Sequence, residues 1–475
     1  MTRPLHCPVA AEPANLRTMV PPHVPKPPAA RRSSGAASVA WLACLLAVSP
    51  RGSAAEVDAL GDYVHRPDPA FSWKLAEKRT VDGVEASRLS LVSQAWRGTN
   101  WTHDVLIVRP AQLRNPDIAF LLIGGDGDVK KQFDVLKMLA DRAGALAAHL
   151  NRVPNQPLYG GRKEDALIAY SFGQYLQSGD RTWPLLFPMV KSAVRAMDAT
   201  EASEAKETGH AIKRWVVSGA SKRGWTTWLT GATDPRVCAI APMVIDMLNM
   251  RVQTDWAAKM YGRQSEEIQD YVDNHIIEHE DDPRMVELRH WVDPYSYRTG
   301  YTVPKLLLLG TDDPYWVVDS LRHYWADLPE PKLVFQTPNA GHDLAGGVEA
   351  KPALAAFFQM VADHQAPPTM SWKFDYSTPK QLSISAKLDR PAKAFRLWTA
   401  SSPVRDFRQA VWSSSDLPPA GAGTAATSEA TGTVQGKDGA YRAALIEAEL
   451  VSADGHPYKL STEARVIPDG PPPAK

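Results

Sequence analysis

The segment Arg214–Trp225 constrains the fold more than any other part of the sequence. A short β-branched run leads into Gly219-Ala-Ser-Lys-Arg-Gly224, and the helix-compatible segment Trp225–Leu229 follows. This order is typical of a nucleophile elbow, in which a strained strand-to-helix turn holds a serine above a sheet. Gly219 can adopt dihedral angles that a Cβ would exclude. The second glycine comes one position later than in the strict Gly-x-Ser-x-Gly pattern, so an ordinary strand-to-helix turn is the alternative to a nucleophilic Ser221.

Strand-like and helical segments alternate on both sides of this turn. Continuous apolar runs predict buried strands at 119–123, 145–150, 239–246, 305–310 and 332–338. Helical spacing occurs in segments 128–143, 164–176, 184–197 and 317–324. Such alternation predicts an α/β fold with a doubly wound, mostly parallel sheet. Residues 247–298, with their helical spacing, predict a cap insertion.

The two ends of the chain differ from this pattern. Residues 56–118 predict an irregular or β-rich lead-in, and we expect the hydrolase-like domain to span 56–367. From 368 to 475 short segments alternate apolar and polar residues, which predicts a β-sandwich-like C-terminal domain. The Gly/Ala/Thr-rich stretch 418–433 predicts a flexible loop within it.

Residues 1–55 have the composition of a secretory signal peptide with a long n-region. Arg31 and Arg32 precede the apolar run 36–49, and Ser53-Ala-Ala55 offers small residues for cleavage. The run is shorter than the ~20 residues that a membrane-spanning helix needs. We therefore expect an exported protein, periplasmic or secreted, without stable membrane insertion. The long n-region leaves Met19 open as the true start.

Charge and cysteine content exclude several function classes. The sequence has 53 basic and 53 acidic side chains, which gives no reason to expect nucleic acid as a partner. Cleavage of the leader would leave one cysteine, Cys238, in an apolar run typical of a core. The sequence has no Cys/His cluster with metal-ligand spacing, so we expect neither a metal nor a cofactor.

The partners of an elbow serine follow in the expected chain order. In this class of hydrolase the acid and the histidine come after later strands of the same sheet. Gly310-Thr-Asp-Asp-Pro314 directly follows one predicted strand, and Asn339-Ala-Gly-His342 follows the next. We expect Asp313 as the acid, because it leaves the loop room to turn back. Asp312 is better explained as a hydrogen-bond acceptor that caps the loop. Asp312 and Asp246 nevertheless remain alternatives for the acid.

The chemistry of these residues predicts their roles. Ser221 would attack a carbonyl, His342 would transfer the proton, and Asp313 would orient the imidazole. An oxyanion hole would combine the amide of Lys222 with that of Gly125 or Asp126.

Aromatic and basic residues suggest candidates for substrate binding. Trp291, Tyr295 and Trp316 lie near the cap boundary and the acid loop, and could line a pocket or pack in the core. Lys222 and Arg223 could bind a substrate carboxylate, or could be solvated charges at a helix start.

Several longer segments resemble the PhoPQ-activated pathogenicity-related protein family. They are Val153–Leu158, Glu164–Tyr170, Thr182–Leu185, Gly219–Trp228, Gly310–Trp316, Asn339–His342 and Ser402–Phe407. The similarity extends over about residues 60–465, and implies an exported α/β-hydrolase-like protein with a C-terminal β-domain. The family's usual Asn-Asp after Gly-Thr is Asp312-Asp313 here, which supports Asp313. The elbow also resembles that of glucuronoyl esterases.

These observations predict an exported serine hydrolase, an esterase or a peptidase, that acts on a small-molecule ester or a peptide. A secreted signalling or binding protein that retains the hydrolase fold is the first alternative. A carbohydrate esterase of the glucuronoyl-esterase type is the second. Ester and amide hydrolysis share the same machinery, so the sequence does not choose between them, and it does not give the oligomeric state.

Overall fold

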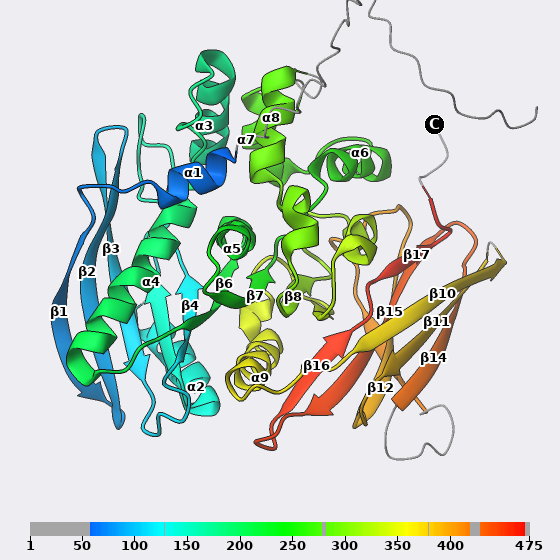
Figure 1. The fold of residues 1–475 in the computed structure, drawn as a ribbon. Coiled ribbons are helices and arrows are strands. Elements are labelled where there is room, and N and C mark those ends of the chain that lie inside the picture. The colour runs from blue at the N-terminus through cyan, green and yellow to red at the C-terminus, as the bar shows by residue number, and fades with distance from the viewer. Residues whose placement is uncertain (1–57, 128, 278–281, 379, 419–427, 471–475) are drawn as a thin grey trace, which may run out of the picture. The chain divides into compact units, whose positions relative to one another are not determined.

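A long mixed sheet runs through the structure, a computed structural model that describes residues 58–470 except 128, 278–281, 379 and 419–427. The strand order is β1-β2-β3-β5-β4-β6-β7-β8-β9 (Figure 1). The strands are β1 (Ser72–Val81), β2 (Val84–Trp96), β3 (Thr99–Arg109), β4 (Ile118–Ile123), β5 (Leu146–Leu150), β6 (Arg214–Ala220), β7 (Val237–Met243), β8 (Lys305–Gly310) and β9 (Lys332–Thr337). Strands β1, β2, β3 and β5 pair antiparallel, and β5 to β9 pair parallel. The predicted signal peptide lies outside the described residues.

Helices cover both faces of this sheet, as a doubly wound fold requires. One face packs under α1 (Ala59–His65), α4 (Leu186–Thr208) and α5 (Lys222–Thr233), and the other under α2 (Val129–Ala143) and α9 (Ala350–Ala362). Successive side chains of the central strands point to opposite faces of the sheet and pack into two different cores. Leu121 and Val217 belong to the first core, and Phe120 and Val216 to the second.

The segment between β7 and β8, where the sequence predicts a cap, folds into short helices. They are α6 (Met250–Tyr261), η1 (Glu266–Ile268), α7 (Gln269–Asp273), α8 (Pro283–Val292) and η2 (Pro294–Gly300). Helix α3 (Glu164–Ser178) packs against α7 and α8. In Figure 1 these helices lie above the sheet, beyond the carboxyl ends of its parallel strands. They therefore cover the sheet edge from which three segments emerge: the elbow, the loop that carries the predicted acid (residues 310–314, the acid loop) and the loop that carries His342 (residues 339–342, the histidine loop).

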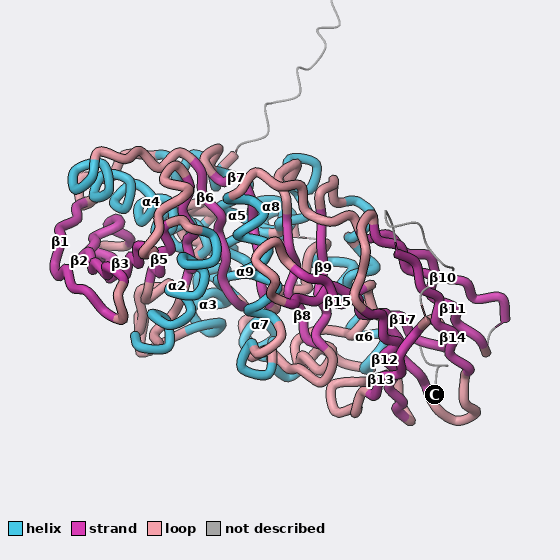
Figure 2. The backbone as a smooth tube through the Cα atoms, turned by 90° about the horizontal axis from the view of Figure 1, so that it is seen from below, coloured by secondary structure: helices cyan, strands magenta, loops and turns pink. Residues whose placement is uncertain are grey.

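Two antiparallel sheets form the C-terminal part, beyond the β9 edge of the long sheet (Figures 1 and 2). One has the order β10 (Met370–Thr378), β11 (Gln381–Leu388), β14 (Ser428–Gln435). The other has β13 (Ser413–Leu417), β12 (Ala394–Ser402), β15 (Tyr441–Val451) and β16 (Pro457–Ser461), and β17 (Arg465–Ile467) pairs with β15. Strand β16 packs on β9 and α9, and the second core continues from beneath α9 into these sheets.

Three segments differ from the sequence-based expectation. The lead-in, predicted as irregular or β-rich, contains the long strands β1 to β3 and differs from the expectation in also containing the helix α1. The stretch predicted as a helix at 317–324 instead forms the 3₁₀ turns η3 (Ser320–His323) and η4 (Trp325–Asp327), and a further turn, η5, spans Ala345–Gly347. The predicted loop 418–433 is wrong from Ser428 onward, because that part is β14. Within the described residues, none of the helices combines the length and apolarity needed to span a membrane.

Candidate active site

The elbow serine stands on a strained turn between β6 and α5. Ser221 has φ 59° and ψ −127°. This conformation is energetically unfavourable for any residue that has a Cβ. A Cβ on Gly219 would lie 2.6 Å from the carbonyl oxygen of Arg223, and one on Gly224 would lie 2.7 Å from that of Met243. Both neighbours are backbone atoms and cannot yield easily. The tight packing explains why position 224 is a glycine.

The histidine and one aspartate form a hydrogen-bonded pair at the same edge of the sheet. Nδ1 of His342 lies 2.8 Å from Oδ2 of Asp313, which is buried. The backbone N–H of Tyr315 donates to Oδ1 of Asp313 at 3.0 Å and fixes the carboxylate. The Tyr315 ring stacks on the imidazole with centroids 4.2 Å apart. Nε2 of His342 is buried without a hydrogen-bond partner among the described residues, so this nitrogen remains available for proton transfer.

The two alternative acids have other partners. Oδ1 of Asp312 accepts hydrogen bonds from the Thr311 hydroxyl and from Nε1 of Trp412. Burial raises the pKa of Asp312 to about 6 despite these donors. Asp246 accepts a hydrogen bond from the Tyr324 hydroxyl at 2.8 Å, and burial raises its pKa to about 8. Among the three candidates, the contact with His342 therefore falls to Asp313.

The residues expected at the oxyanion hole lie around the elbow. Lys222 is the first residue of α5, where backbone N–H groups lack partners within the helix. Gly124 and Gly125, after β4, accept hydrogen bonds from the backbone of Val153 and Arg152. A Cβ on Gly125 would lie 2.4 Å from Nη2 of Arg223. Glycine therefore lets this turn approach the elbow, while the Asp126 side chain is exposed.

The two basic side chains beside Ser221 are neither solvated nor free for a substrate. Nζ of Lys222 lies 2.9 Å from Glu164 and 3.1 Å from Asp165. Arg223 donates to both carboxylate oxygens of Glu164 at 2.7 Å and also bonds the carbonyl of Val153. Burial alone would raise the pKa of Glu164, but the hydrogen bonds and charge of Arg223, with Lys222, lower it to about 2. This cluster anchors the start of α3 to the elbow.

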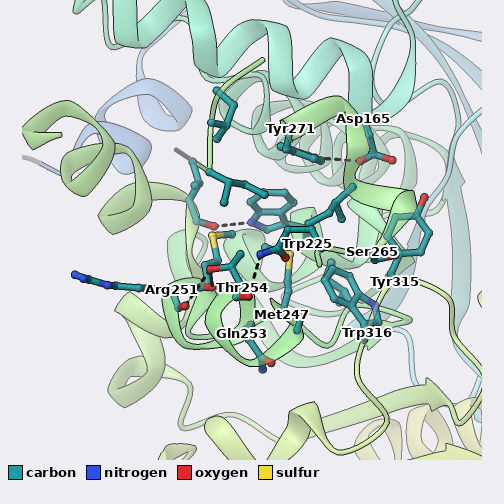
Figure 3. Close-up of a pocket in the computed structure, with 18 of the residues that line it drawn as sticks. Asp165, Trp225, Met247, Arg251, Gln253, Thr254, Ser265, Tyr271, Tyr315 and Trp316 are labelled. Carbon is teal, nitrogen blue, oxygen red and sulfur yellow. Dashed lines mark hydrogen bonds between the residues drawn. The ribbon is translucent and has the colours of Figure 1, made fainter. Parts of the chain in front are cut away.

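A cavity of about 150 Å³ lies beside Ser221, and Figure 3 shows the side chains that surround it. Its wall includes Ser221, Tyr315 and Trp316 together with apolar side chains of the elbow, α3 and the cap. Tyr315 thus contacts both the cavity and the His342 ring.

Of the three aromatic residues proposed for the substrate pocket, Trp316 lies on the cavity wall. The other two lie elsewhere in the described structure. Trp291 is buried against Tyr175 and Phe187 as part of the core. The hydroxyl of Tyr295 donates to Asp327 at 2.6 Å, and Tyr295 is not among the described residues that line the cavity.

Sequence reasoning missed three residues of this site. Tyr315 follows the predicted acid by two positions, so its place in Gly310–Trp316 was a usable signal. Glu164 and Asp165 had a weaker one, as two acids at the start of a predicted helix. Nothing in the local pattern connects them to the elbow, although Glu164 forms ion pairs with Lys222 and Arg223, directly after Ser221, which lies 57 residues later in the chain.

The strand order and the places of Ser221, Asp313 and His342 after β6, β8 and β9 define an α/β-hydrolase fold. The chain carries short helices between β7 and β8, where a cap was predicted, and antiparallel sheets at its C-terminus.

The chain belongs to the PhoPQ-activated pathogenicity-related protein family, whose model matches residues 60–408. A relative from Dictyostelium discoideum, autocrine proliferation repressor protein A, is 31% identical over 454 residues, which cover 86% of this chain and 90% of that protein.

Among solved structures, acetyl xylan esterase 1 from Thermoanaerobacterium sp. JW/SL YS485 is similar to 64% of this chain and 92% of its own, with a TM-score of 0.46 and 15% identity. An acetyl xylan esterase from Paenibacillus sp. R4 is similar to 63% of this chain and 94% of its own, with a TM-score of 0.47 and 14% identity.

Proposed function

We propose that the protein is an exported serine hydrolase, an esterase or a peptidase, with Ser221, His342 and Asp313 as its catalytic residues. One observation carries the proposal. The His342–Asp313 pair has an unpartnered Nε2 within the described structure, and it stacks against Tyr315 on the cavity that Ser221 also lines. The signal-peptide pattern of residues 1–55 supports export to the periplasm or beyond.

The reaction begins when Oγ of Ser221 attacks the substrate carbonyl carbon and its proton passes to Nε2 of His342. Asp313 holds the imidazole orientation and stabilises its charged form. The amides of Lys222 and of Gly125 or Asp126 would stabilise the negative oxygen of the tetrahedral intermediate. The bond to the leaving alcohol or amine then breaks, and His342 returns the proton to it. Water attacks the acyl-enzyme by the same route and releases the acid and the free serine.

A secreted signalling or binding protein is the second candidate, because a relative at 31% identity is named an autocrine proliferation repressor. A carbohydrate esterase of the glucuronoyl-esterase type has less support. The cations that would bind a uronate carboxylate, Lys222 and Arg223, are paired with Glu164 and Asp165.

Labelling by a fluorophosphonate probe tests the proposal without knowledge of the substrate. We expect the purified protein to be labelled and Ser221→Ala to lose all labelling. Ser414→Ala, which changes an exposed serine of β13, is the matched control and should label like the wild type. Unlabelled but folded wild-type protein would reject the hydrolase and favour the signalling protein.

A further inference from the structure

The cavity beside Ser221 has walls that are predominantly apolar. Trp225 and Met247 contribute to it from the elbow helix and the segment after β7 (Figure 3). Phe172 contributes from α3 and Met285 from α8. Apolar walls exclude an ionic group, because a charge placed there loses its hydration without compensation. An apolar cavity of about 150 Å³ accommodates a molecule of the size of benzene in other proteins.

The charged groups on the wall are already engaged. Asp165 accepts a hydrogen bond from the Tyr271 hydroxyl at 3.1 Å and pairs with Nζ of Lys222. Arg251 and Arg289 also interact within the protein. Burial raises the pKa of Tyr271 well above its ordinary value, so this phenol remains a neutral donor. Among the described residues of the wall, none therefore remains as a strong counter-ion for a charged substrate group.

Two polar atoms on the wall remain unpaired. Nε1 of Trp316 and Oε1 of Gln264 are buried, and neither has a hydrogen-bond partner among the residues described. Both residues line the cavity. A buried donor and acceptor without partners cost free energy in the empty site, and a ligand with one polar atom would recover part of it.

We propose that this cavity binds the uncharged, apolar group of the substrate, about as large as a phenyl ring or a four- to six-carbon chain. This inference rests on the proposed function and adds a substrate class to it: esters or amides of short apolar acids, or of small apolar alcohols or amines. The acyl group and the leaving group share this chemistry, and the experiment separates them.

The test is a series of p-nitrophenyl esters from acetate to decanoate, with phenylacetate and a singly charged succinate added. Each methylene that enters the cavity should raise kcat/KM by up to about fourfold. We expect kcat/KM to peak at butanoate, hexanoate or phenylacetate and to fall at decanoate. A preference for succinate over hexanoate would overturn the proposal. So would a protein that the fluorophosphonate labels but for which both this acyl series and a matching series of aryl and alkyl acetates are flat. Absent labelling would instead reject the hydrolase itself.

Two variants of the wall give opposite expectations. Ala257→Phe, on α6, should lower kcat/KM for hexanoate at least tenfold relative to acetate, because the new ring fills the cavity. Met247→Ala should move the optimum to a longer chain. Val252→Phe, on the exposed side of α6, is the control and should leave the profile unchanged. If Ala257→Phe alters a series of aryl and alkyl acetates but not the acyl series, the cavity holds the leaving group. Equal losses for acetate and hexanoate, with no change of preference among the aryl and alkyl acetates, would contradict the proposal.

A different set of contacts concerns the C-terminal sheets. The loop between β12 and β13 ends at Trp412, whose Nε1 donates to Oδ1 of Asp312 at 3.0 Å. The backbone N–H of Trp412 donates to Oδ1 of Asn339 at 2.7 Å, and Nδ2 of Asn339 donates back to its carbonyl at 3.0 Å. Asp312 precedes the acid Asp313, and Asn339 lies three residues before His342. One residue of the C-terminal part thus holds both catalytic loops.

The two loops also bind each other. The N–H of Asp312 donates to the carbonyl of Ala340 at 2.9 Å, and that of Asn339 to the Thr311 hydroxyl at 3.0 Å. A Cβ on Gly310 would lie 2.3 Å from the Ala340 carbonyl oxygen. We infer that Trp412 is a positioning residue, which sets the His342–Asp313 geometry through its hydrogen bonds to Asp312 and Asn339 and through the hydrogen bonds between the two loops.

Trp412→Phe tests the inference because it removes the indole N–H and keeps an aromatic ring. We expect kcat on the best p-nitrophenyl ester and the rate of fluorophosphonate labelling to fall about tenfold, with KM nearly unchanged. Trp398→Phe is the matched control, since its indole N–H lacks a partner in the described structure. A lower melting temperature with wild-type kcat would mean that Trp412 is only structural and would overturn the inference.

Discussion

Two adjacent aspartates illustrate how strongly single residues depend on their surroundings. Asp313 contacts Nδ1 of His342, whereas Asp312 is bound by Thr311 and Trp412. If Asp313 orients the imidazole, Asp313→Asn should lower kcat by about 10⁴-fold, the loss seen when the equivalent acid of a serine protease becomes an amide.

Asp312→Asn is the neighbouring control, and its effect on kcat should be far smaller. Steady-state kinetics with the best p-nitrophenyl ester would compare the two variants. Equal losses in both would show that the pair acts as one unit, contrary to the assignment of Asp313 alone.

A pH dependence follows from the cluster at the elbow. Arg223 and Lys222 lower the pKa of Glu164 to about 2, from an ordinary value of 4.5. A carboxylate with a depressed pKa stabilises the folded state above its unfolded pKa, and this stabilisation is lost as the pH falls toward the folded value. The wild type should therefore have a higher melting temperature than Glu164→Gln at pH 6. The difference should shrink between about pH 4.5 and pH 2.

Melting temperatures of both proteins across pH 2–7 would measure this effect. Because Glu164 is 39% exposed, we expect a modest shift rather than unfolding. A difference that stays constant down to pH 2 would show that the ion pairs do not stabilise the fold.

At the residue scale, the sequence was most informative where chain order restricts geometry. Serine, aspartate and histidine after three parallel strands of one sheet were expected to meet at one sheet edge, and the His342–Asp313 contact agrees with that expectation. Aromatic residues near the cap carried no such restriction. Trp291 and Trp316 look alike in sequence, yet one is core and the other lines the cavity, because burial alone does not say which neighbours surround a ring.

At the scale of the element, we expect alanine substitutions at two helical glycines to have opposite effects on the stability of the protein. A Cβ on Gly224 in α5 would lie 2.7 Å from the Met243 carbonyl oxygen, which is backbone of β7 and cannot move freely. Gly224→Ala should therefore destabilise the protein by about 1–3 kcal/mol.

Gly173 in α3 gives the matched control. A Cβ there would meet nothing within 4 Å in the described structure. Gly173→Ala should stabilise the protein by about 0.4–1 kcal/mol, because it restricts the unfolded chain. Denaturant titrations would measure both changes. Destabilisation by Gly173→Ala, or tolerance of Gly224→Ala, would contradict the packing described for the elbow.

Strands with a continuous apolar run were predictable one by one, strands with apolar/polar alternation were predictable as β-rich regions, and some edge and loop-flanking strands were not predictable. The runs at 119–123 and 305–310 became β4 and β8. The hairpin β1–β2 has an exposed outer strand, so its sequence lacks a run of apolar residues. Strand β14 follows a Gly/Ala/Thr-rich stretch, and only its pairing with β11 makes it a strand. Tertiary context overrides weak local propensity in such segments.

At the scale of the whole molecule, the C-terminal sheets are bound to the rest by a buried ion pair. Nη2 of Arg405, from the segment Ser402–Phe407, lies 2.8 Å from Oδ2 of Asp319, and both side chains are 0% exposed. Nη1 of Arg322 also lies 3.0 Å from that oxygen. Burial alone would raise the pKa of Asp319, but the charges of Arg405 and Arg322 lower it to about 2. The pair joins the β12–β13 loop to the segment that follows the acid loop.

Removal of Arg405 should be costly, because the buried Asp319 carboxylate loses its buried counter-ion and retains the partly exposed Arg322. Arg405→Met should lower the free energy of unfolding by about 3–5 kcal/mol. The double variant Arg405→Met, Asp319→Leu should recover much of that loss, since it removes both charges together. Lys380→Met, which breaks an exposed pair with Asp438, is the control and should change little. Urea titrations of Arg405→Met, of Asp319→Leu and of the double variant would measure the free energy of unfolding. If the loss in the double variant equals the sum of the two single losses, the pair does not couple the C-terminal sheets to the rest of the molecule.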